Sequence, residues 1–365
     1  MTDFPAHAEH LDCLQANLAL LADRFHGAGT HTRLGSALRC SPRPLTDGPL
    51  AGLLTVEPTL DQHLADAADL LGLDVAGRRR HAPGDAPDTA DGPVYVVADA
   101  YHLPWVPYYG TKHVEHSFLV DDDGGDSLTI SDAYLNDTQW GKARPVRLPY
   151  SREDFTALFK ALPEGAESVR CTPRPLGSPP RARVAPGPPP EYLRGYAEHP
   201  DRRAALDAFT LETWLLARAR RLHAAYLAEH GATGAESEPV LAHLRQWDGL
   251  VEHTYLAFRR VDRGRAEPPG LFERAAEVLA QDAVVFGAEA AVREVVCSVL
   301  RIPETALSER DLTFHPEFNS IRMVEVVEIL EERFAVEFDP ADLVPENLQS
   351  IENLCALLNR ATDRE

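Results

Sequence analysis

Three side chains in the first half of the chain have the types needed for nucleophilic catalysis by a thiol. Cys13 follows Asp12 at the start of a predicted helix, His116 begins a predicted strand, and Asp132 ends the next strand. In such a set the thiol attacks an activated carbonyl, the imidazole takes the thiol proton, and the carboxylate fixes the imidazole tautomer. The pattern therefore predicts catalysis by Cys13, His116 and Asp132, with Cys13 as the nucleophile.

Two of these assignments have competitors in the sequence. His113 lies three residues before His116, but His116 leads directly into the apolar run SFLV and is preferred for that reason. Asn136 and Asp137 follow Asp132 closely enough to replace it as the residue that orients the histidine. These alternatives stay open at the level of sequence.

The place of Cys13 also predicts its electrostatics. Backbone N–H groups and the helix dipole favour an anion at a helix N-terminus, so we expect the pKa of this thiol to fall below the ~8.5 of a free cysteine. No glutamine precedes Cys13. The backbone N–H of Cys13 is therefore expected to hold an oxyanion, with His7, His10 or Gln15 as weaker candidates.

A second reactive side chain lies near the C-terminus, in HPEFNSIRMVEVVEILEERF at 315–334. Ser320 starts an amphipathic helix, where a serine either caps the helix or carries a group. The expected core stripe consists of Val324, Val327, Leu330 and Phe334, with the acidic side chains largely off it: Glu325, Glu328, Glu331 and Glu332.

The elements that must position Cys13 and its partners are a helix and a sheet. Leu14, Leu18, Leu21 and Phe25 share one helical face and Gly27 follows, which predicts a helix from about 13 to 26. The β-rich runs are at 94–101, 116–121 and 127–134, and DDDGGD between the last two predicts a hairpin. Residues 1–171 are thus expected to form an α+β domain.

The rest of the chain is expected to be helical after a proline-rich break. Residues 172–190, TPRPLGSPPRARVAPGPPP, are typical of a semi-rigid linker. Residues 191–287 predict a helical subdomain. Residues 288–365 predict a C-terminal module of four helical segments, the third of them a short turn at DPADL.

Composition limits the partners. The formal net charge of the 365-residue chain is −21, with 57 acidic against 36 basic residues, which argues against nucleic acid or an anionic membrane as the main partner. Five cysteines without a CxxC pair fit a reducing compartment and predict no metal site. No signal peptide and no apolar run of membrane-spanning length are visible, so we expect a cytoplasmic protein.

The C-terminal module resembles an acyl or peptidyl carrier protein. The resemblance depends on Phe318-Asn319-Ser320-Ile321, then VEVVEILEERFAVEF, DPADL and SIENLCALL, although Asn319 stands where such carriers usually have Asp. It implies a four-helix bundle with a covalent 4′-phosphopantetheine arm on Ser320. The implied partners are a phosphopantetheinyl transferase and an adenylating or acyl-loading enzyme.

The N-terminal domain resembles papain-like enzymes, and more narrowly the butirosin-type aminoacyltransferases. The matching features are Cys13 with LQANLALLADRFHG, then VADAYHLPWVPYYGTKHVEHSFLV, then ISDAY. The resemblance implies transfer of an acyl or aminoacyl group from a carrier thioester to an amine, with formation of an amide or a lactam. The implied setting is antibiotic or other natural product biosynthesis.

Two other functions are compatible with the same residues. With water as the acceptor, Cys13, His116 and Asp132 would make a thioesterase or a peptidase. Without catalysis, the N-terminal domain would be a scaffold that presents the carrier to other enzymes. The fused carrier favours transfer, and the ordered set of three residues disfavours the scaffold.

Overall fold

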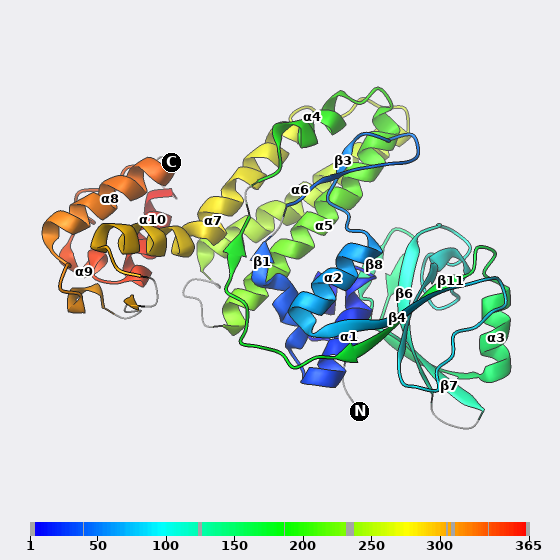
Figure 1. Cartoon of the computed structure of the whole chain (residues 1–365). Helices are drawn as coiled ribbons and strands as arrows, with labels where there is room; N and C mark the ends of the chain where they lie inside the picture. Colours follow the sequence, from blue (N-terminus) through cyan, green and yellow to red (C-terminus); the bar gives the residue numbers. More distant parts are fainter. Residues whose placement is uncertain are drawn as a thin grey trace. The chain divides into compact units, whose positions relative to one another are not determined.

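The computed structural model divides the chain into two compact units, each built from separate stretches of sequence (Figure 1). Unit 1 contains Met1–Ser36, Glu57–Arg181 and Arg218–Tyr226, and unit 2 contains Ala37–Val56, Ala182–Ala217 and Leu227–Glu365. Within them the structure describes residues 4–38, 40–122, 126–185, 187–230, 237–303, 306–307, 311–334 and 336–362.

Unit 1 is built on a six-stranded antiparallel sheet in the order β10-β7-β6-β5-β11-β4. The strands are β4 (Leu73–His81), β5 (Val94–Asp99), β6 (Glu115–Asp122), β7 (Ser127–Asp132), β10 (Val146–Ser151) and β11 (Ala166–Pro173). The central strands β5 and β6 are buried over most of their length, as continuous apolar runs require. The predicted hairpin is confirmed by the antiparallel pairing of β6 with β7, although its turn lies partly outside the described residues.

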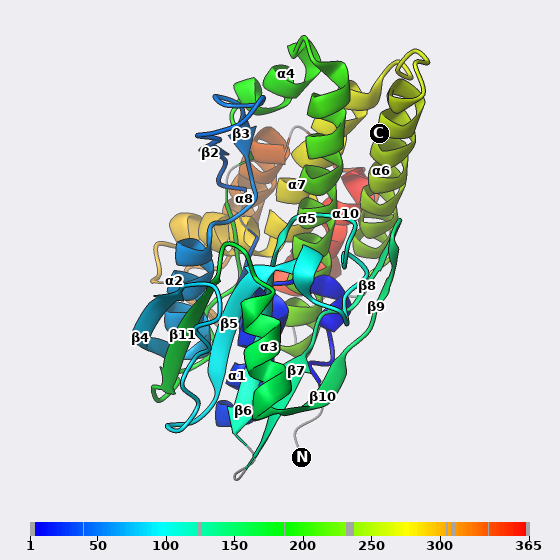
Figure 2. The same cartoon turned by 90° about the vertical axis from the view of Figure 1, so that its right-hand side faces the viewer.

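Helices cover both faces of this sheet. Helix α3 (Arg152–Lys160) packs its Phe155, Leu158 and Phe159 against strand residues such as Phe118 and Ile130. Helix α1 (Gln15–His26) lies against β6, β7 and β11. Figure 2 shows α3 in front of the sheet and α1 behind it. Helix α2 (Leu60–Leu71) packs against α1 and β4 and was not predicted.

Helix α1 begins with a reciprocal cap that fixes the backbone around Cys13. The Asp12 carboxylate accepts hydrogen bonds from the backbone N–H groups of Leu14 and Gln15, both at 2.8 Å. The Gln15 side-chain oxygen in turn accepts from the Asp12 N–H at 3.3 Å. The helix ends at Gly27 with φ 108°, where a side chain would be strained. The helix predicted at 13–26 is thus confirmed.

Unit 2 contains two helical cores. Its longer helices are α4 (Pro190–Glu198), α5 (Arg202–Glu229, of which Arg218–Tyr226 belongs to unit 1), α6 (Glu238–Asp262) and α7 (Leu271–Leu300). Aromatic residues such as Tyr192, Phe209 and Trp247 fill the first core. The short strand pairs β1 (Ala37–Leu38) with β12 (Arg183–Val184), and β2 (Arg43–Pro44) with β3 (Leu54–Thr55), complete the unit.

The second core is that of the C-terminal helical module. It joins the end of α7 to α8 (Ser320–Phe334), the short α9 (Pro345–Leu348) and α10 (Ile351–Thr362). Helix α7 contributes Leu271 and Val278 to the first core, and Val292 and Val299 to the second. The predicted break near residue 288 therefore falls inside a continuous helix, because one helix supplies apolar side chains to both cores.

The proline-rich segment is bound to distant parts of the chain, which the semi-rigid linker suggested by its composition does not require. The guanidinium of Arg33 binds the carbonyls of Gly177 and Ser178 at 2.8 and 2.6 Å. Further along, β12 pairs with β1 in parallel. The segment is held because its backbone acceptors meet donors from distant parts of the sequence, so the expected boundaries at 171 and 190 do not coincide with the two units.

Within the described part of the chain, no helix combines the length and the apolar character that crossing a membrane requires.

Candidate functional site

The structure brings His116 and Asp132 into direct contact. Nε2 of His116 lies 2.7 Å from Oδ2 of Asp132, and both side chains are almost fully buried. The other ring nitrogen of His116, Nδ1, is buried and has no hydrogen-bond partner among the described residues. With Nε2–H donated to the carboxylate, Nδ1 carries the lone pair and is the atom able to accept a proton.

Asp132 is held by donors on both of its oxygens. Oδ2 also accepts a hydrogen bond from Nε1 of Trp105 at 2.9 Å, and Oδ1 accepts from the backbone N–H of Tyr134 at 3.0 Å. Burial alone would raise the pKa of this carboxyl, but the charge of His116 and the hydrogen bonds together lower it. Asp132 is therefore the ionised acceptor that faces Nε2 of His116.

Asn17 ties helix α1 to the two strands that carry the pair. Its Nδ2 donates to the Ser117 carbonyl at 2.8 Å and to Oδ1 of Asp132 at 3.2 Å. Its Oδ1 accepts from the Ala133 N–H at 2.8 Å. Asn17 is fully buried and lies one helical turn after Cys13. The sequence analysis missed it, although a polar residue inside the apolar stretch LQANLALL was a visible signal.

Cys13 lies beside strand β6 and contacts Glu115 and Ser117, the residues before and after His116. Its Sγ donates to the Glu115 carbonyl at 3.3 Å, and its own carbonyl accepts from the Ser117 hydroxyl at 2.6 Å. The residue as a whole is partly exposed. The thiol, the imidazole and the carboxylate thus occupy one region of unit 1.

The expected low pKa of Cys13 is wrong for this structure. Burial raises the pKa of the thiol well above its usual value, and the negative charges of Asp12 and Asp132 raise it further. The Cys13 backbone N–H acts in the opposite direction. The sequence correctly placed Cys13 near a helix N-terminus. It could not show that the thiol is desolvated or that two carboxylates lie nearby. Cys13 is therefore a neutral thiol that must lose its proton during attack.

The competing residues have other partners. His113 is largely exposed, bonds to Asp99 at 2.6 Å and stacks on Tyr101. Asn136 contacts the Tyr134 hydroxyl and the Arg218 guanidinium instead of His116. Asp137, also exposed, pairs with Arg144.

A partly buried cation, Arg218, borders the site. Arg218, from α5, donates to the carbonyls of Leu11 and Leu135 and to Oδ1 of Asn136. Burial lowers the pKa of this guanidinium, and nearby acidic groups, Tyr134 and Asp12 among them, act against that shift. Nothing in the local sequence around Arg218 signals this role, because its partners lie far away along the chain.

The weaker oxyanion candidates have other roles or places. Gln15 uses its side-chain oxygen in the helix cap described above. His7 and His10 form a separate group with Glu9. The Cys13 backbone N–H lies close enough to Sγ to affect its pKa, and it is the donor that the site offers at the nucleophile itself.

Ser320 occupies the first position of α8 but does not cap it. Oδ1 of Asn319 accepts from the backbone N–H groups of Ile321 and Arg322, both at 3.1 Å. Ser320 is exposed, and its hydroxyl makes no hydrogen bond to any described residue. A helix cap supplied by the preceding residue leaves the serine hydroxyl available for modification, which fits a covalently attached arm.

The prediction that Val324 of α8 belongs to the core is wrong. Val324 is 57% exposed, and the buried positions are Met323, Val326, Val327 and Leu330. The buried face of α8 includes Met323 and Val326 in place of Val324. This face is therefore rotated by about one residue from the predicted one. Val324 instead joins Ile321 and Phe314, both 80% exposed, as apolar side chains on the surface near Ser320.

Comparison with protein families identifies the C-terminal module. Residues 290–358 match the family described as the phosphopantetheine attachment site. Such a domain carries 4′-phosphopantetheine covalently on a serine and is modified by phosphopantetheinyl transferases. The carrier domain implies that the protein handles phosphopantetheine-tethered acyl or peptidyl groups in biosynthesis. No curated protein matched the chain significantly.

Proposed function

We propose that unit 1 is a cysteine acyltransferase with a papain-like arrangement, and that Ser320 is the attachment serine of its fused carrier. The acyltransferase would move an acyl or aminoacyl group from a carrier thioester through Cys13 to an amine. The observation that carries the proposal is His116, whose Nε2 is engaged by Asp132 while its Nδ1 is buried without a partner among the described residues.

The first step is attack by the Cys13 sulfur on the carbonyl carbon of the thioester substrate. Because the thiol pKa is raised, the proton leaves during the attack and passes to His116 Nδ1. The imidazolium that results is stabilised by the ionised Asp132. The Cys13 backbone N–H is the proposed donor to the oxyanion.

Collapse of the tetrahedral species breaks the bond to the original thioester sulfur. That sulfur leaves as a thiol with the proton from His116, and the acyl group stays on Cys13 as a new thioester. This exchange is close to isoenergetic, so positioning and oxyanion stabilisation are what the enzyme must supply.

In the second step an amine attacks the acyl group on Cys13. His116 Nδ1 takes a proton from the attacking nitrogen and returns it to the Cys13 sulfur as the C–S bond breaks. The products are an amide and the free thiol, and amide formation makes this step downhill. An amine on the acyl chain itself would give a lactam by the same route.

Ser320 supports the carrier half of the proposal. When bound, the 4′-phosphopantetheine arm supplies a long, flexible thiol that holds the acyl group as a thioester. The exposed Ser320, the Asn319 cap and the apolar Ile321 and Val324 beside it are the features with which this chain presents the serine. A phosphopantetheinyl transferase and an adenylating or acyl-loading enzyme are the proposed partners.

The proposal is tested with the full-length chain. A phosphopantetheinyl transferase loads it from a panel of acyl- and aminoacyl-coenzyme A donors, a panel of primary amines is added, and products are identified by mass spectrometry. Amide formation that is lost in Cys13→Ala but kept in Cys297→Ala supports transfer. Cys13-dependent release of free acid in the presence of amines would mean a hydrolase. Turnover independent of Cys13 would contradict the proposal.

A further inference from the structure

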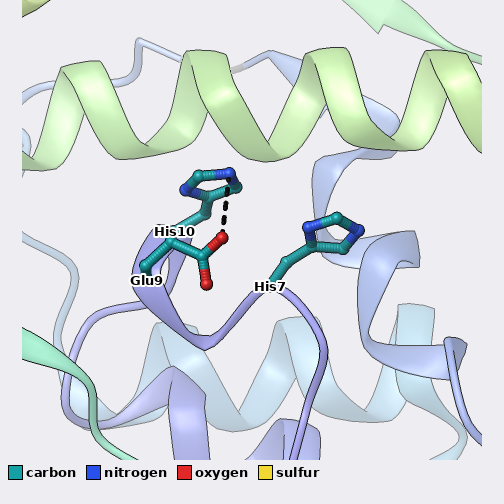
Figure 3. A group of neighbouring side chains, drawn as sticks. All are labelled: His7, Glu9 and His10. Carbon is teal, nitrogen blue, oxygen red and sulfur yellow. Dashed lines mark ion pairs between the residues drawn. The ribbon is translucent and has the colours of Figure 1, made fainter.

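A group of three metal-ligating side chains lies just before Cys13 in the chain. His7, Glu9 and His10 each offer one ligand atom, and these atoms lie within 4.8 Å of one another. Figure 3 shows the two imidazoles with the Glu9 carboxylate turned toward His10, whose Nε2 lies 3.7 Å from Oε1 of Glu9. His7 and His10 are partly exposed and Glu9 is exposed, so an ion from solvent can reach them.

The sequence HAEH brings the two histidines together through the local backbone. Ala8–His10 forms the 3-10 helix η1, and His10 N–H donates to the His7 carbonyl at 2.9 Å. In this type of helix the side chains at i and i+3 eclipse each other. The rings of His7 and His10 accordingly stack at 5.7 Å between centroids, with 12° between their planes.

A ring nitrogen beside this group lacks the partner that a buried polar atom requires. Nε2 of His31 is buried with no hydrogen-bond partner among the described residues. His31 is fully buried, and its ring centroid lies 5.9 Å from that of His7. An ion bound nearby is one of the standard explanations for such a nitrogen.

The contact of His31 with Asp23 is a second feature that is typical of histidines near metal ions. Its Nδ1 lies 2.8 Å from Oδ2 of the buried Asp23, and its backbone N–H donates to Oδ1 of the same residue. A carboxylate behind an imidazole is the usual way in which proteins fix the tautomer and the ring orientation of histidines at metal centres. With Nδ1 engaged, His31 directs its lone pair through Nε2.

We propose that His7, Glu9 and His10 bind a divalent transition-metal ion, with zinc as the best fit to two imidazoles and one carboxylate. For ligand bonds of about 2.1 Å, a tetrahedral site separates its ligands by about 3.4 Å. The ligand atoms lie within 4.8 Å of one another, so small side-chain rotations would bring them to the separation that zinc requires. The fourth position is left for water or, after a shift of His7, for His31. The sequence predicted no metal site because its cysteines form no CxxC pair.

The surrounding charges make Glu9 essential to this site. Arg218 and Arg221 lie close enough to act on His10 electrostatically, and both would repel a cation. Glu9 is the anionic ligand that offsets this repulsion. The site would fix the turn that leads to Leu11, whose carbonyl binds Arg218, and it requires no particular chemistry at Cys13. It is thus independent of the proposed transferase activity.

The test is metal binding by the full-length chain. After chelation and equilibrium dialysis against zinc sulfate, elemental analysis should find one zinc ion per chain. His7→Ala and His10→Ala should each lose this ion, and Glu9→Gln should hold it more weakly. The matched control His253→Ala, on helix α6 of unit 2, should keep it. Equal zinc content in wild type and His10→Ala, or no retained zinc in wild type, would overturn the proposal.

A cobalt spectrum gives a second readout that does not depend on activity. Cobalt(II) in place of zinc should show ligand-field bands without a thiolate-to-metal charge-transfer band, because the proposed ligands are nitrogen and oxygen. A charge-transfer band that disappears in Cys13→Ala would place the metal on the cysteine and contradict the site. Zinc should also raise the Tm of wild type, since an ion that binds only the folded state stabilises it, and should leave the Tm of His10→Ala unchanged.

Discussion

The two candidate nucleophiles of this chain lie in opposite kinds of surroundings. Ser320 is exposed, starts a helix capped by its neighbour Asn319, and has no hydrogen bond to any described residue. Cys13 has a desolvated sulfur that donates to the Glu115 carbonyl, in a site with His116 and Asp132. Ser320 is exposed at the surface, whereas the sulfur of the partly exposed Cys13 is desolvated.

The difference follows from what would act on each residue. A serine that another enzyme modifies must fit into that enzyme's site, so its own surroundings need to offer access rather than activation. A cysteine that itself attacks a thioester needs a base, an orienting group and low water content around it. The carrier half can therefore be encoded by one contiguous segment, whereas the catalytic half needs residues from several.

The largest effect is expected at Ser320. Ser320→Ala should abolish addition of the arm by a broad-specificity phosphopantetheinyl transferase with coenzyme A, because Ser320 is the exposed serine that starts α8 with its helix capped by Asn319. Intact-protein mass spectrometry measures the addition. Ser298→Ala, an exposed serine within the matched carrier region on α7, is the control and should accept one arm. An undiminished addition to Ser320→Ala would contradict the assignment.

The next largest effect is expected at His116. His116→Ala removes the proposed proton acceptor, and general-base catalysis is worth roughly 10²–10⁴ in rate. His113→Ala should cost far less, because that side chain is exposed and pairs with Asp99. Transfer rates on the same acyl donor measure both. The double variant Cys13→Ala/His116→Ala should be no worse than the single ones, since the residues act as a unit. Equal losses for His113→Ala and His116→Ala would count against the site.

Asp132→Asn should cause a smaller loss of transfer together with a loss of stability. Each oxygen of Asp132 accepts two hydrogen bonds, one from His116 and Trp105, the other from Asn17 and the Tyr134 N–H. An amide nitrogen must face one of these donor pairs, which costs about 1–3 kcal/mol. Urea unfolding measures the cost.

The control for this variant is Asp137→Asn at an exposed position, which should leave the urea midpoint nearly unchanged. The pKa of Asp132 is lowered in the folded state. Its contribution to stability is therefore present above the unfolded pKa of about 3.9 and is lost as the pH falls through the lower folded pKa. Asp132→Asn should remove that part of the acid dependence, and an unaltered acid profile would contradict the role.

The smallest effect is a shift in the titration of Cys13. Asp12→Asn keeps an oxygen for the helix cap but removes the negative charge that raises the thiol pKa. The pH at which iodoacetamide alkylates Cys13 should therefore move down, as measured by peptide mapping. Asp69→Asn, an exposed residue on α2, should leave it unchanged. If Asp12→Asn does not change the pH dependence of alkylation, the charge of Asp12 does not contribute to the raised pKa of the thiol.

The contrast between the two regions also explains what the sequence could predict. Ser320 was found because its helix, its loop and its neighbours are contiguous. His116 and Asp132 were found because the hairpin turn places their strands side by side. Asn17 and Arg218 were missed, since their partners lie on other segments and their contacts form only on packing.

The same reasoning accounts for the expectations that differed from the structure. The pKa of Cys13 depends on burial and on carboxylates brought together by the fold, and neither is visible in the local sequence. The proline-rich segment is held by Arg33, from far upstream, so composition alone suggested a linker. The exposure of Val324 reflects the rotation of α8, which periodicity fixes only to about one residue.

The central claim, that Cys13 carries the acyl group, is tested most directly by trapping that group. The arm of the full-length chain is loaded with an acyl donor that wild type transfers, the amine is withheld, and the quenched protein is mapped by peptide mass spectrometry. In wild type we expect the acyl mass on the peptide that contains Cys13. In Cys13→Ala we expect no acyl mass on that peptide or on any other cysteine. A Cys13→Ala variant that transfers to the amine at the wild-type rate would contradict the account.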